Sequence, residues 1–218
     1  VFTRYLLKNS LVAVQELRAI LRLDPQNAEA HANLGVIAFT QGNYAEAARG
    51  FRAALKFQPE LWNAQAFLGM CDLRLGRAAQ AKPLLEGSFS HLEDTVLRTQ
   101  GGLDLVQIHQ ASKELQRAVD VLGDLQRVRP DDPDILYAAY RTYSDLAARA
   151  LASLAQAAPE SARMHEILAQ TLASQDDFPG AIAQYRRALA IDPRLPGIHF
   201  ELGQVILANS RGEPALQE

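Results

Sequence analysis

Cysteine is almost absent from this chain, because Cys71 is the single cysteine among 218 residues. One cysteine excludes a disulfide framework within the chain and a zinc site built on cysteine ligands. Its neighbours Leu68, Met70 and Leu73 are apolar, a setting typical of a small core residue. The count is compatible with the cytoplasm, which we slightly favour, and with the periplasm.

Excess positive charge and long apolar runs are also missing. The formal net charge is -3 and no stretch is strongly basic, which argues against a nucleic-acid partner. No uncharged apolar run approaches the roughly 18 residues that a membrane span needs. The start, Val1-Phe2-Thr3-Arg4, has no Met and no signal-peptide layout. We therefore expect a fragment of a longer protein, without a membrane span.

The composition that remains favours helices. Apolar residues make up 48% of the chain and charged residues 22%, the range of an ordinary folded protein. Aromatic residues are only 7%, and the apolar share depends on Ala and Leu, which head the helix-propensity scale. The expected fold class is all-α.

Two segments of the chain align without gaps, 28–59 and 162–193. Small residues match small ones and large residues match large ones at fixed places, and each segment ends in proline. The matched pairs are His31 with His165, Leu34 with Leu168, Gly35 with Ala169, Ala47 with Ala181, Phe51 with Tyr185, Ala54 with Ala188, and Pro59 with Pro193. From Pro25 to Pro59, and from Pro159 to Pro193, the spacing is 34 residues.

This pattern resembles the tetratricopeptide repeat, in which W-x2-L-G-x2-Y, A-x3-F and a closing P recur over 34 residues. The resemblance implies a right-handed α-solenoid of stacked antiparallel helical hairpins, with about five to six repeats including partial ones. Small residues such as Gly35 and Ala47 let the two helices of a hairpin approach closely. Gly42 suits a left-handed turn between them, and Pro59 ends the second helix. Each hairpin buries its apolar face only against its neighbours.

The expected organisation is one array over 1–218, with irregular spacing in its middle. From Pro59 to Pro130 there are three residues more than two periods, and from Pro130 to Pro159 five fewer than one. The extra residues lengthen a loop or helix around Ser88 to Gln100, and 137–158 forms either one long helix or two with a tight turn. The expected units are a partial repeat at 1–27, repeats at 28–61 and 62–98, a degenerate repeat at 99–132, a shortened repeat at 133–161, a repeat at 162–195 and a partial repeat at 196–218.

No catalytic, metal or cofactor site is predicted. His31, His165 and His199 occupy the consensus tryptophan position, and we interpret them as packed rings. His165-Glu166 lacks the second histidine of a zinc-protease helix. The acidic loop 131–134 is interpreted as helix capping rather than a calcium site. His91 and His109 have no partner that the sequence can place.

The resemblance implies that the first helix of each repeat lines a concave groove. We expect a partner segment to lay its apolar side on the early repeats and its polar side on the later ones. The alternative is that the large apolar residues pack on the adjacent repeat. The expected groove residues are Val36, Phe39, Asn63, Met70, Leu73, Gln107, Arg163 and Gln170.

The predicted function is therefore a non-catalytic scaffold that binds a protein or peptide. The alternative is the repeat portion of a larger enzyme, such as a glycosyltransferase, whose catalytic domain lies outside this chain. Self-association through uncapped ends is a further option. The groove lacks the Lys and Arg with which chaperone-tail binders of this family hold a C-terminal carboxylate, so acidic tails are not expected ligands.

Overall fold

The computed structural model describes the backbone of residues 10–212 and the side chains of residues 11–210, and all its regular structure is helical. The ends of the expected partial repeats, residues 1–9 and 213–218, lie outside the described residues. The helices are α2 (Ser10–Leu23), α3 (Ala28–Thr40), α4 (Tyr44–Phe57), α5 (Trp62–Arg74), α6 (Ala78–Phe89), α7 (Thr95–Ala111), α8 (Leu115–Val128), α9 (Pro133–Ala157), α10 (Ala162–Ser174), α11 (Phe178–Ile191) and α12 (Ile198–Gly212). None of these helices is long and apolar enough to cross a bilayer.

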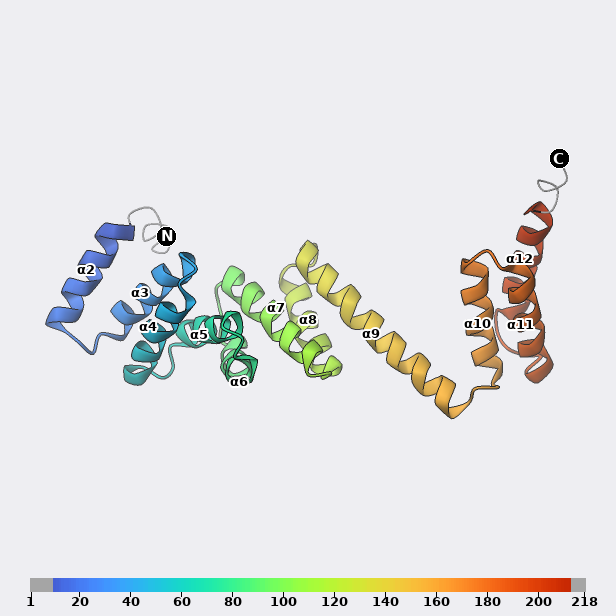
Figure 1. Cartoon of the computed structure of the whole chain (residues 1–218), viewed down its shortest axis with the longest axis horizontal. Helices are drawn as coiled ribbons and strands as arrows, with labels where there is room; N and C mark the ends of the chain where they lie inside the picture. Colours follow the sequence, from blue (N-terminus) through green and yellow to red (C-terminus); the bar gives the residue numbers. More distant parts are fainter. Residues whose placement is uncertain (1–9, 213–218) are drawn as a thin grey trace. The chain divides into compact units, whose positions relative to one another are not determined.

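The chain forms two compact units, the first ending at Asp145 and the second beginning at Leu146. In the first unit α3 packs on α4, α5 on α6 and α7 on α8, which makes three helical hairpins (Figure 1). Successive hairpins stack through α4 on α5 and α6 on α7, and α2 packs on α3. In the second unit α10 and α11 form a hairpin and α12 packs on α11. These are the stacked hairpins of the expected α-solenoid.

Close approach within each hairpin depends on small residues in its first helix. A Cβ added to Gly35 would lie 2.9 Å from the Phe51 ring, and one added to Gly69 would lie 2.7 Å from Leu85. Phe51 is fully buried and Leu85 nearly so. Because these contacts leave no room for a methyl group, the glycines set the distance between the paired helices.

The turn inside each hairpin needs one residue in the left-handed region. Gly42 and Gly76 have φ of 76° and 75°, so the left-handed turn expected at Gly42 is confirmed. The corresponding residues of the α7–α8 and α10–α11 turns are Lys113 and Asp176, with φ of 60° and 61°. The turn geometry is therefore retained in these two hairpins without glycine, at a steric cost for the lysine.

The irregular spacing has a clear structural origin. α7 begins at Thr95 and spans 17 residues, so the extra residues extend this helix at its start, and the expected boundary at 98/99 falls inside it. The segment expected as a shortened repeat, 133–161, contributes one continuous helix, α9, and not a hairpin. Between residues 146 and 157 the chain is rich in Ala and Leu and has no Gly, Pro, Asn or Asp to start a turn.

Phe51→Ala should lower the free energy of unfolding by about 3–5 kcal/mol, because it empties a fully buried site that the Gly35 backbone cannot refill. Tyr185→Ala, at the matching buried site of the second unit, should cost a similar amount. Urea denaturation followed by circular dichroism measures both. Phe57→Ala is the control, since Phe57 is 39% exposed, and should cost less than about 1 kcal/mol. Equal losses for Phe51 and Phe57 would contradict the packing.

Candidate functional site

A groove of about 580 Å³ lies on the first unit, where α3 and α5 meet the start of α7. Three first helices of successive hairpins therefore supply its walls, as expected for a concave face. The residues that line it are Glu29, Ala32, Asn33 and Val36 from α3; Leu61, Asn63, Ala64 and Phe67 at α5; Asp94, Val96, Leu97 and Gln100 at α7; and Phe51.

The floor of the groove is apolar and its rim is polar. Phe67 is half-buried and stacks on the buried Phe51 ring, with centroids 5.3 Å apart and planes 5° apart. Phe39 meets Phe67 edge-on, with ring centroids 5.2 Å apart, so Phe67 contacts two aromatic neighbours. Asn63 and Gln100 lie exposed along the rim. A rigid aromatic floor below amide side chains can hold both apolar and main-chain groups of a ligand.

Some of the predicted groove residues line the groove in the structure, and others are packed into the core. Val36 and Asn63 line the groove, and Phe39 and Leu73 are half-buried because they pack on their own chain's core. The prediction for Met70 is wrong: it is 1% exposed and lies in the core of the first unit, so it offers no surface to a partner.

The predicted polar residues lie outside this groove. Gln107 is exposed on α7 but is not among the lining residues. Arg163 and Gln170 belong to α10 in the second unit, where each contacts a carboxylate of that unit. The Arg163 guanidinium pairs with Glu166 at 2.8 Å, and the Gln170 amide donates to Glu201 at 3.1 Å.

Phe67 and Val96 are groove residues that the sequence reasoning missed. Phe67 lies on α5 between the predicted residues Asn63 and Met70, and Val96 belongs to the extra turn at the start of α7. The irregular spacing indicated extra residues before Gln100, and extra residues lengthen a neighbouring helix or loop. The sequence could therefore have indicated that Val96 lies on an extended helix.

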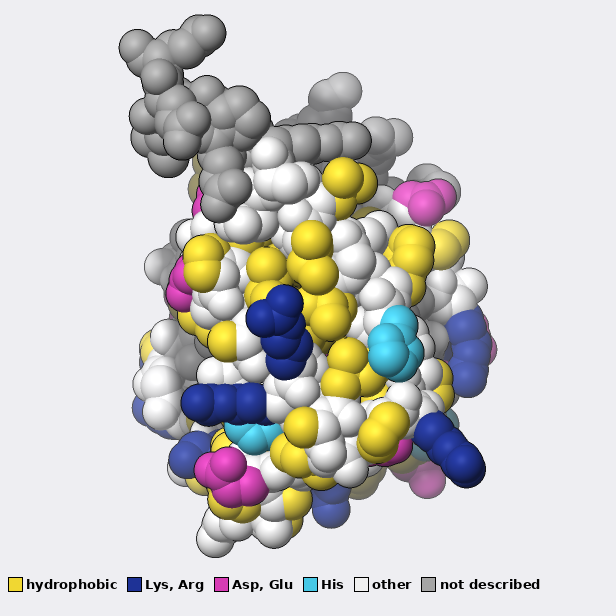
Figure 2. Space-filling view, turned by 90° about the vertical axis from the view of Figure 1, so that its right-hand side faces the viewer, with side chains coloured by type: hydrophobic (Ala, Val, Ile, Leu, Met, Phe, Trp, Pro, Cys, Tyr) yellow, Lys and Arg dark blue, Asp and Glu magenta, His cyan; other side chains and the backbone are white. Residues whose placement is uncertain are grey.

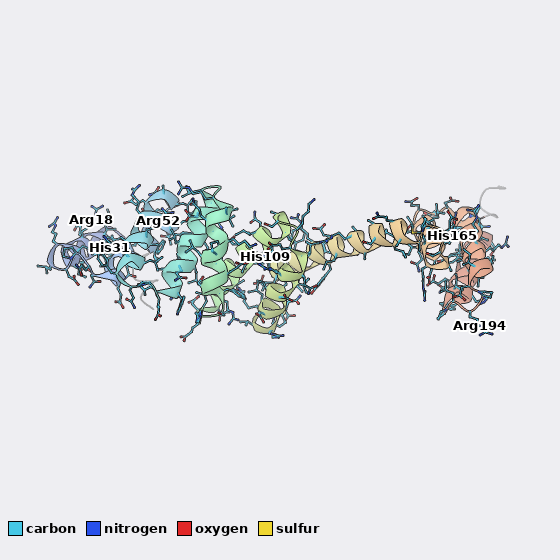
Figure 3. The ribbon with its side chains drawn as sticks, turned by 90° about the horizontal axis from the view of Figure 1, so that it is seen from below. Arg18, His31, Arg52, His109, His165 and Arg194 are labelled. Carbon is cyan, nitrogen blue, oxygen red and sulfur yellow. The ribbon has the colours of Figure 1, made fainter. Side chains whose placement is uncertain are left out.

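A second cavity of about 520 Å³ lies among α2, α3 and α4. Its lining includes His31, Arg18 and Arg49 beside apolar residues of α2 and α3. His31 lies on α3 and is labelled in Figure 3. Its Nε2 lies 3.0 Å from the Pro25 carbonyl oxygen, so this ring N–H donates to the preceding turn. This contact gives His31 a structural role.

The other repeat histidines have comparable contacts. His199 Nε2 lies 3.3 Å from the Pro193 carbonyl oxygen, the same arrangement as at His31. Gln65, at the matching place in α5, donates to the Pro59 carbonyl at 2.7 Å. His165 is buried and its Nδ1 lies 2.8 Å from the Gln184 side-chain oxygen. These contacts account for the three histidines as packed, hydrogen-bonded rings.

Asp132 caps the start of α9. Its Oδ1 accepts the backbone N–H groups of Asp134 and Ile135 at 3.0 and 3.2 Å. The capping interpretation of the acidic loop is confirmed.

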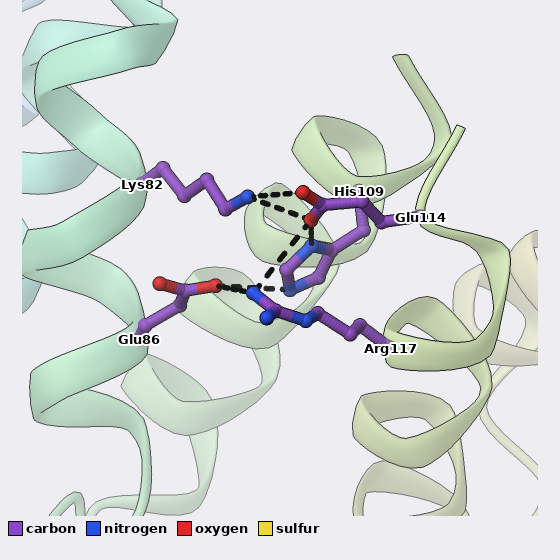
Figure 4. A network of polar contacts seen from close by, with 5 residues as sticks. All are labelled: Lys82, Glu86, His109, Glu114 and Arg117. Atoms are coloured by element: carbon purple, nitrogen blue, oxygen red, sulfur yellow. Dashed lines mark hydrogen bonds and ion pairs between the residues drawn. The ribbon is translucent and has the colours of Figure 1, made fainter. Parts of the chain in front are cut away.

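His109 lies at the centre of a network that joins α6, α7 and α8 (Figure 4). Its Nδ1–H donates to Glu114 at 2.8 Å, and its Nε2 lies 3.7 Å from Glu86. Lys82 binds both oxygens of Glu114, at 2.7 and 2.6 Å, and Arg117 binds Glu86 at 3.2 Å. The sequence did not reveal this network, because its members come from three helices.

The geometry of this network is that of a structural ion-pair cluster. Oxygen or nitrogen atoms of Glu86, His109 and Glu114 lie within 4.8 Å of one another, as a metal site would require. Each carboxylate is already neutralised by a fixed cation, Lys82 or Arg117, and a divalent ion would have to displace them. The network therefore ties the second hairpin to the third.

The surface of the second unit carries exposed apolar side chains on α12. Phe200 is 69% exposed and Leu207 53%. Figure 2 shows one face of the molecule, where hydrophobic side chains lie among basic and acidic ones. Isolated apolar side chains are normal on a surface, so these mark no site by themselves.

Comparison with known families agrees with this architecture. A tetratricopeptide repeat model matches residues 9–61, and a second TPR repeat model matches residues 169–210. A comparison with curated proteins finds no significant match. The hairpin stacking defines a helical-repeat protein, and the two matches identify tetratricopeptide repeats in residues 9–61 and 169–210. Proteins of this family are generally non-catalytic scaffolds for protein interactions.

Similar solved structures show the same fold. YrrB, described as a TPR protein with an unusual peptide-binding site, is 18% identical, with a TM-score of 0.52 over 96% of this chain and 89% of that one. Pseudomonas aeruginosa pilF is 18% identical, with a TM-score of 0.51 over 93% of this chain and 94% of that one. The APC/C hetero-tetramer Cut9-Hcn1 is 18% identical, with a TM-score of 0.50 over 94% of this chain and 41% of that one.

Changing the pH should test the Glu114 contacts. Hydrogen bonds from Lys82, and then from His109, lower the pKa of Glu114 from 4.5 to about 2. Because the folded-state pKa is the lower one, these contacts stabilise the fold above about pH 4.5, and this stabilisation is lost as the pH falls toward 2. Glu114→Gln should flatten that part of the curve of urea midpoint against pH. Glu93→Gln, at an exposed carboxylate, should leave the curve unchanged.

The Cys71 thiol should be inert in the folded protein. Burial, followed by the charge of Asp72, raises the pKa of this thiol from 9.0 to about 12. Since the thiolate is the reactive form, labelling by a thiol reagent at pH 8 should be about a hundredfold or more slower in native protein than in denaturant. Equal labelling rates in the two states would contradict the buried position of Cys71.

Proposed function

We propose that this protein is a binding scaffold whose first unit holds a segment of a partner protein in the groove between α3, α5 and α7. The observation that carries the proposal is a preformed groove of about 580 Å³ with an apolar floor and a polar rim. Pockets of this size and character are the usual form of a recognition site. Among the described residues that line the groove, no nucleophilic side chain is paired with a general base. Binding is therefore the function that these side chains favour.

The rigidity of the groove also supports recognition. Its floor is fixed by the stacked rings of Phe51 and Phe67, and its walls by the close packing of Gly35 and Gly69. A preorganised surface loses little conformational entropy when it binds, so more of the contact energy appears as affinity. YrrB, the TPR protein described as having an unusual peptide-binding site, is a precedent for peptide binding on this fold.

The volume of the groove, about 580 Å³, suits a single segment of chain. Val36 from α3 and Phe67 from α5 both line the groove, and Val96 at the start of α7, also a lining residue, is 61% exposed. We expect one or two apolar side chains of the partner to rest between these residues. The amides of Asn63 and Gln100 would then donate and accept hydrogen bonds at the edges.

Filling the groove should abolish binding. Fifteen-residue peptides selected by display on the whole chain would be measured by fluorescence anisotropy against the native protein and Ala32→Trp. Ala32 lines the groove, so the added indole should raise Kd about tenfold or more, which corresponds to about 1.4 kcal/mol. Asn63→Trp, at an exposed lining position, provides a second blocking variant.

The matched control is Ala19→Trp, which places the same side chain on an exposed face of α2 outside the groove. Its Kd values should stay within about twofold of the native protein. Thermal unfolding of all three variants separates loss of binding from loss of folding. If no selected peptide distinguishes the two blocking variants from Ala19→Trp, the groove is not the binding site.

A further inference from the structure

The groove of the first unit carries negative charge without any compensating positive side chain. Glu29 and Asp94 are its formally charged lining residues, and no Lys, Arg or His is among the residues that line it. Both carboxylates are exposed. Within residues 11–210 neither of them takes part in an ion pair. Two negative charges therefore face whatever occupies the groove.

Helix ends reduce this charge but do not cancel it. Glu29 lies in the first turn of α3, and Asp94 is the N-cap of α7, where its Oδ1 accepts the Leu97 N–H at 2.8 Å. Each helix start carries a partial charge of roughly +0.5, and its effect falls off within one turn. At α3 the Asn27 side chain already accepts the Ala30 N–H. Roughly half a positive charge from each of the starts of α3, α5 and α7 is less than the two formal negative charges of Glu29 and Asp94.

The neighbouring side chains define the rest of the ligand. Ala32, Val36 and Phe67 are half-buried and supply an apolar strip in the same groove as the two carboxylates. A ligand that fits must therefore present an aliphatic side chain to this strip and positive charge to the carboxylates. An acidic peptide would meet both carboxylates with like charge, which is unfavourable in a partly desolvated site.

We infer that the segment held in this groove is basic and aliphatic, with Arg or Lys side chains paired to Glu29 and Asp94 and an apolar side chain seated on Val36 and Phe67. This inference rests on the groove being the binding site. It names the ligand class: a cationic stretch of a protein partner. Arg suits the site best, because its planar guanidinium binds a carboxylate with two parallel hydrogen bonds.

Three synthetic peptides of twelve residues test this ligand class. The first repeats Arg-Leu-Ser, the second replaces each Arg with citrulline, its neutral isostere, and the third replaces each Arg with Glu. Fluorescence anisotropy gives Kd for each at about 25 and 250 mM salt. Each of the two exposed ion pairs should contribute about two- to fivefold in Kd, so the arginine peptide should bind about four- to twenty-five-fold more tightly than the citrulline peptide. Added salt should reduce the ratio of the two Kd values, because it screens the ion pairs.

The double variant Glu29→Gln with Asp94→Asn removes both carboxylates. Asn is itself a good N-cap, so the start of α7 remains capped. In this variant the arginine and citrulline peptides should bind with equal Kd. The control, Glu16→Gln with Asp131→Asn, changes the net charge equally at exposed residues outside the groove and should retain the preference.

The outcomes separate the ligand class from the site. If the citrulline peptide binds as tightly as the arginine peptide, or the double variant keeps the preference, the basic ligand is wrong. The groove itself then stands if Ala32→Trp still weakens the selected peptides. If Ala32→Trp and Ala19→Trp behave alike for every peptide, the binding site is wrong and the inference fails with it.

Discussion

The close contact between a small residue on one helix and a large side chain on the next determines the arrangement of the first unit. Gly35 lies against Phe51, Gly69 against Leu85, and Gly102 against Leu125 and Phe89. These contacts bring paired helices near enough to exclude water, which is the main source of stability in a fold without sheets. They also decide which faces of α3, α5 and α7 remain free. The groove exists on those faces because the opposite faces are fully occupied.

Ion pairs between hairpins complement this packing by setting the alignment of neighbours. Arg52 of α4 binds the buried Asp72 of α5 at 2.7 Å, and Arg74 of α5 binds Asp104 of α7. Burial raises the pKa of Asp104 despite its arginine partner, so desolvation of this carboxylate is costly. A buried carboxylate tolerates few alternative arrangements, because a shifted neighbour would leave it unpaired. Such pairs favour one stacking register over others.

The sequence predicted the hairpins well because their signals are local. The left-handed turn at Gly42 and the cap at Asp132 depend on the conformation of a few adjacent residues. The groove was harder to predict, since a residue's place in a repeat gives its helix but not how far its neighbours cover it. Met70 was assigned to the surface on that basis, and its burial depends on three hairpins packing together. His109 and its partners were missed for the same reason.

The contact between a side chain at the fourth position of a repeat and the preceding proline carbonyl suggests why such repeats diverge so freely. His31 and His199 carry an imidazole and Gln65 an amide, yet each places an N–H group where that carbonyl can accept it. The family's usual tryptophan also carries an N–H donor. These three repeats share a side-chain N–H donor at this place, and two residue types, His and Gln, supply it. A repeat can therefore keep its structure when its residues differ from the family pattern. The hairpin that contains Gln65 is an example, because it lies between residues 9–61 and 169–210, the two segments that the family models match.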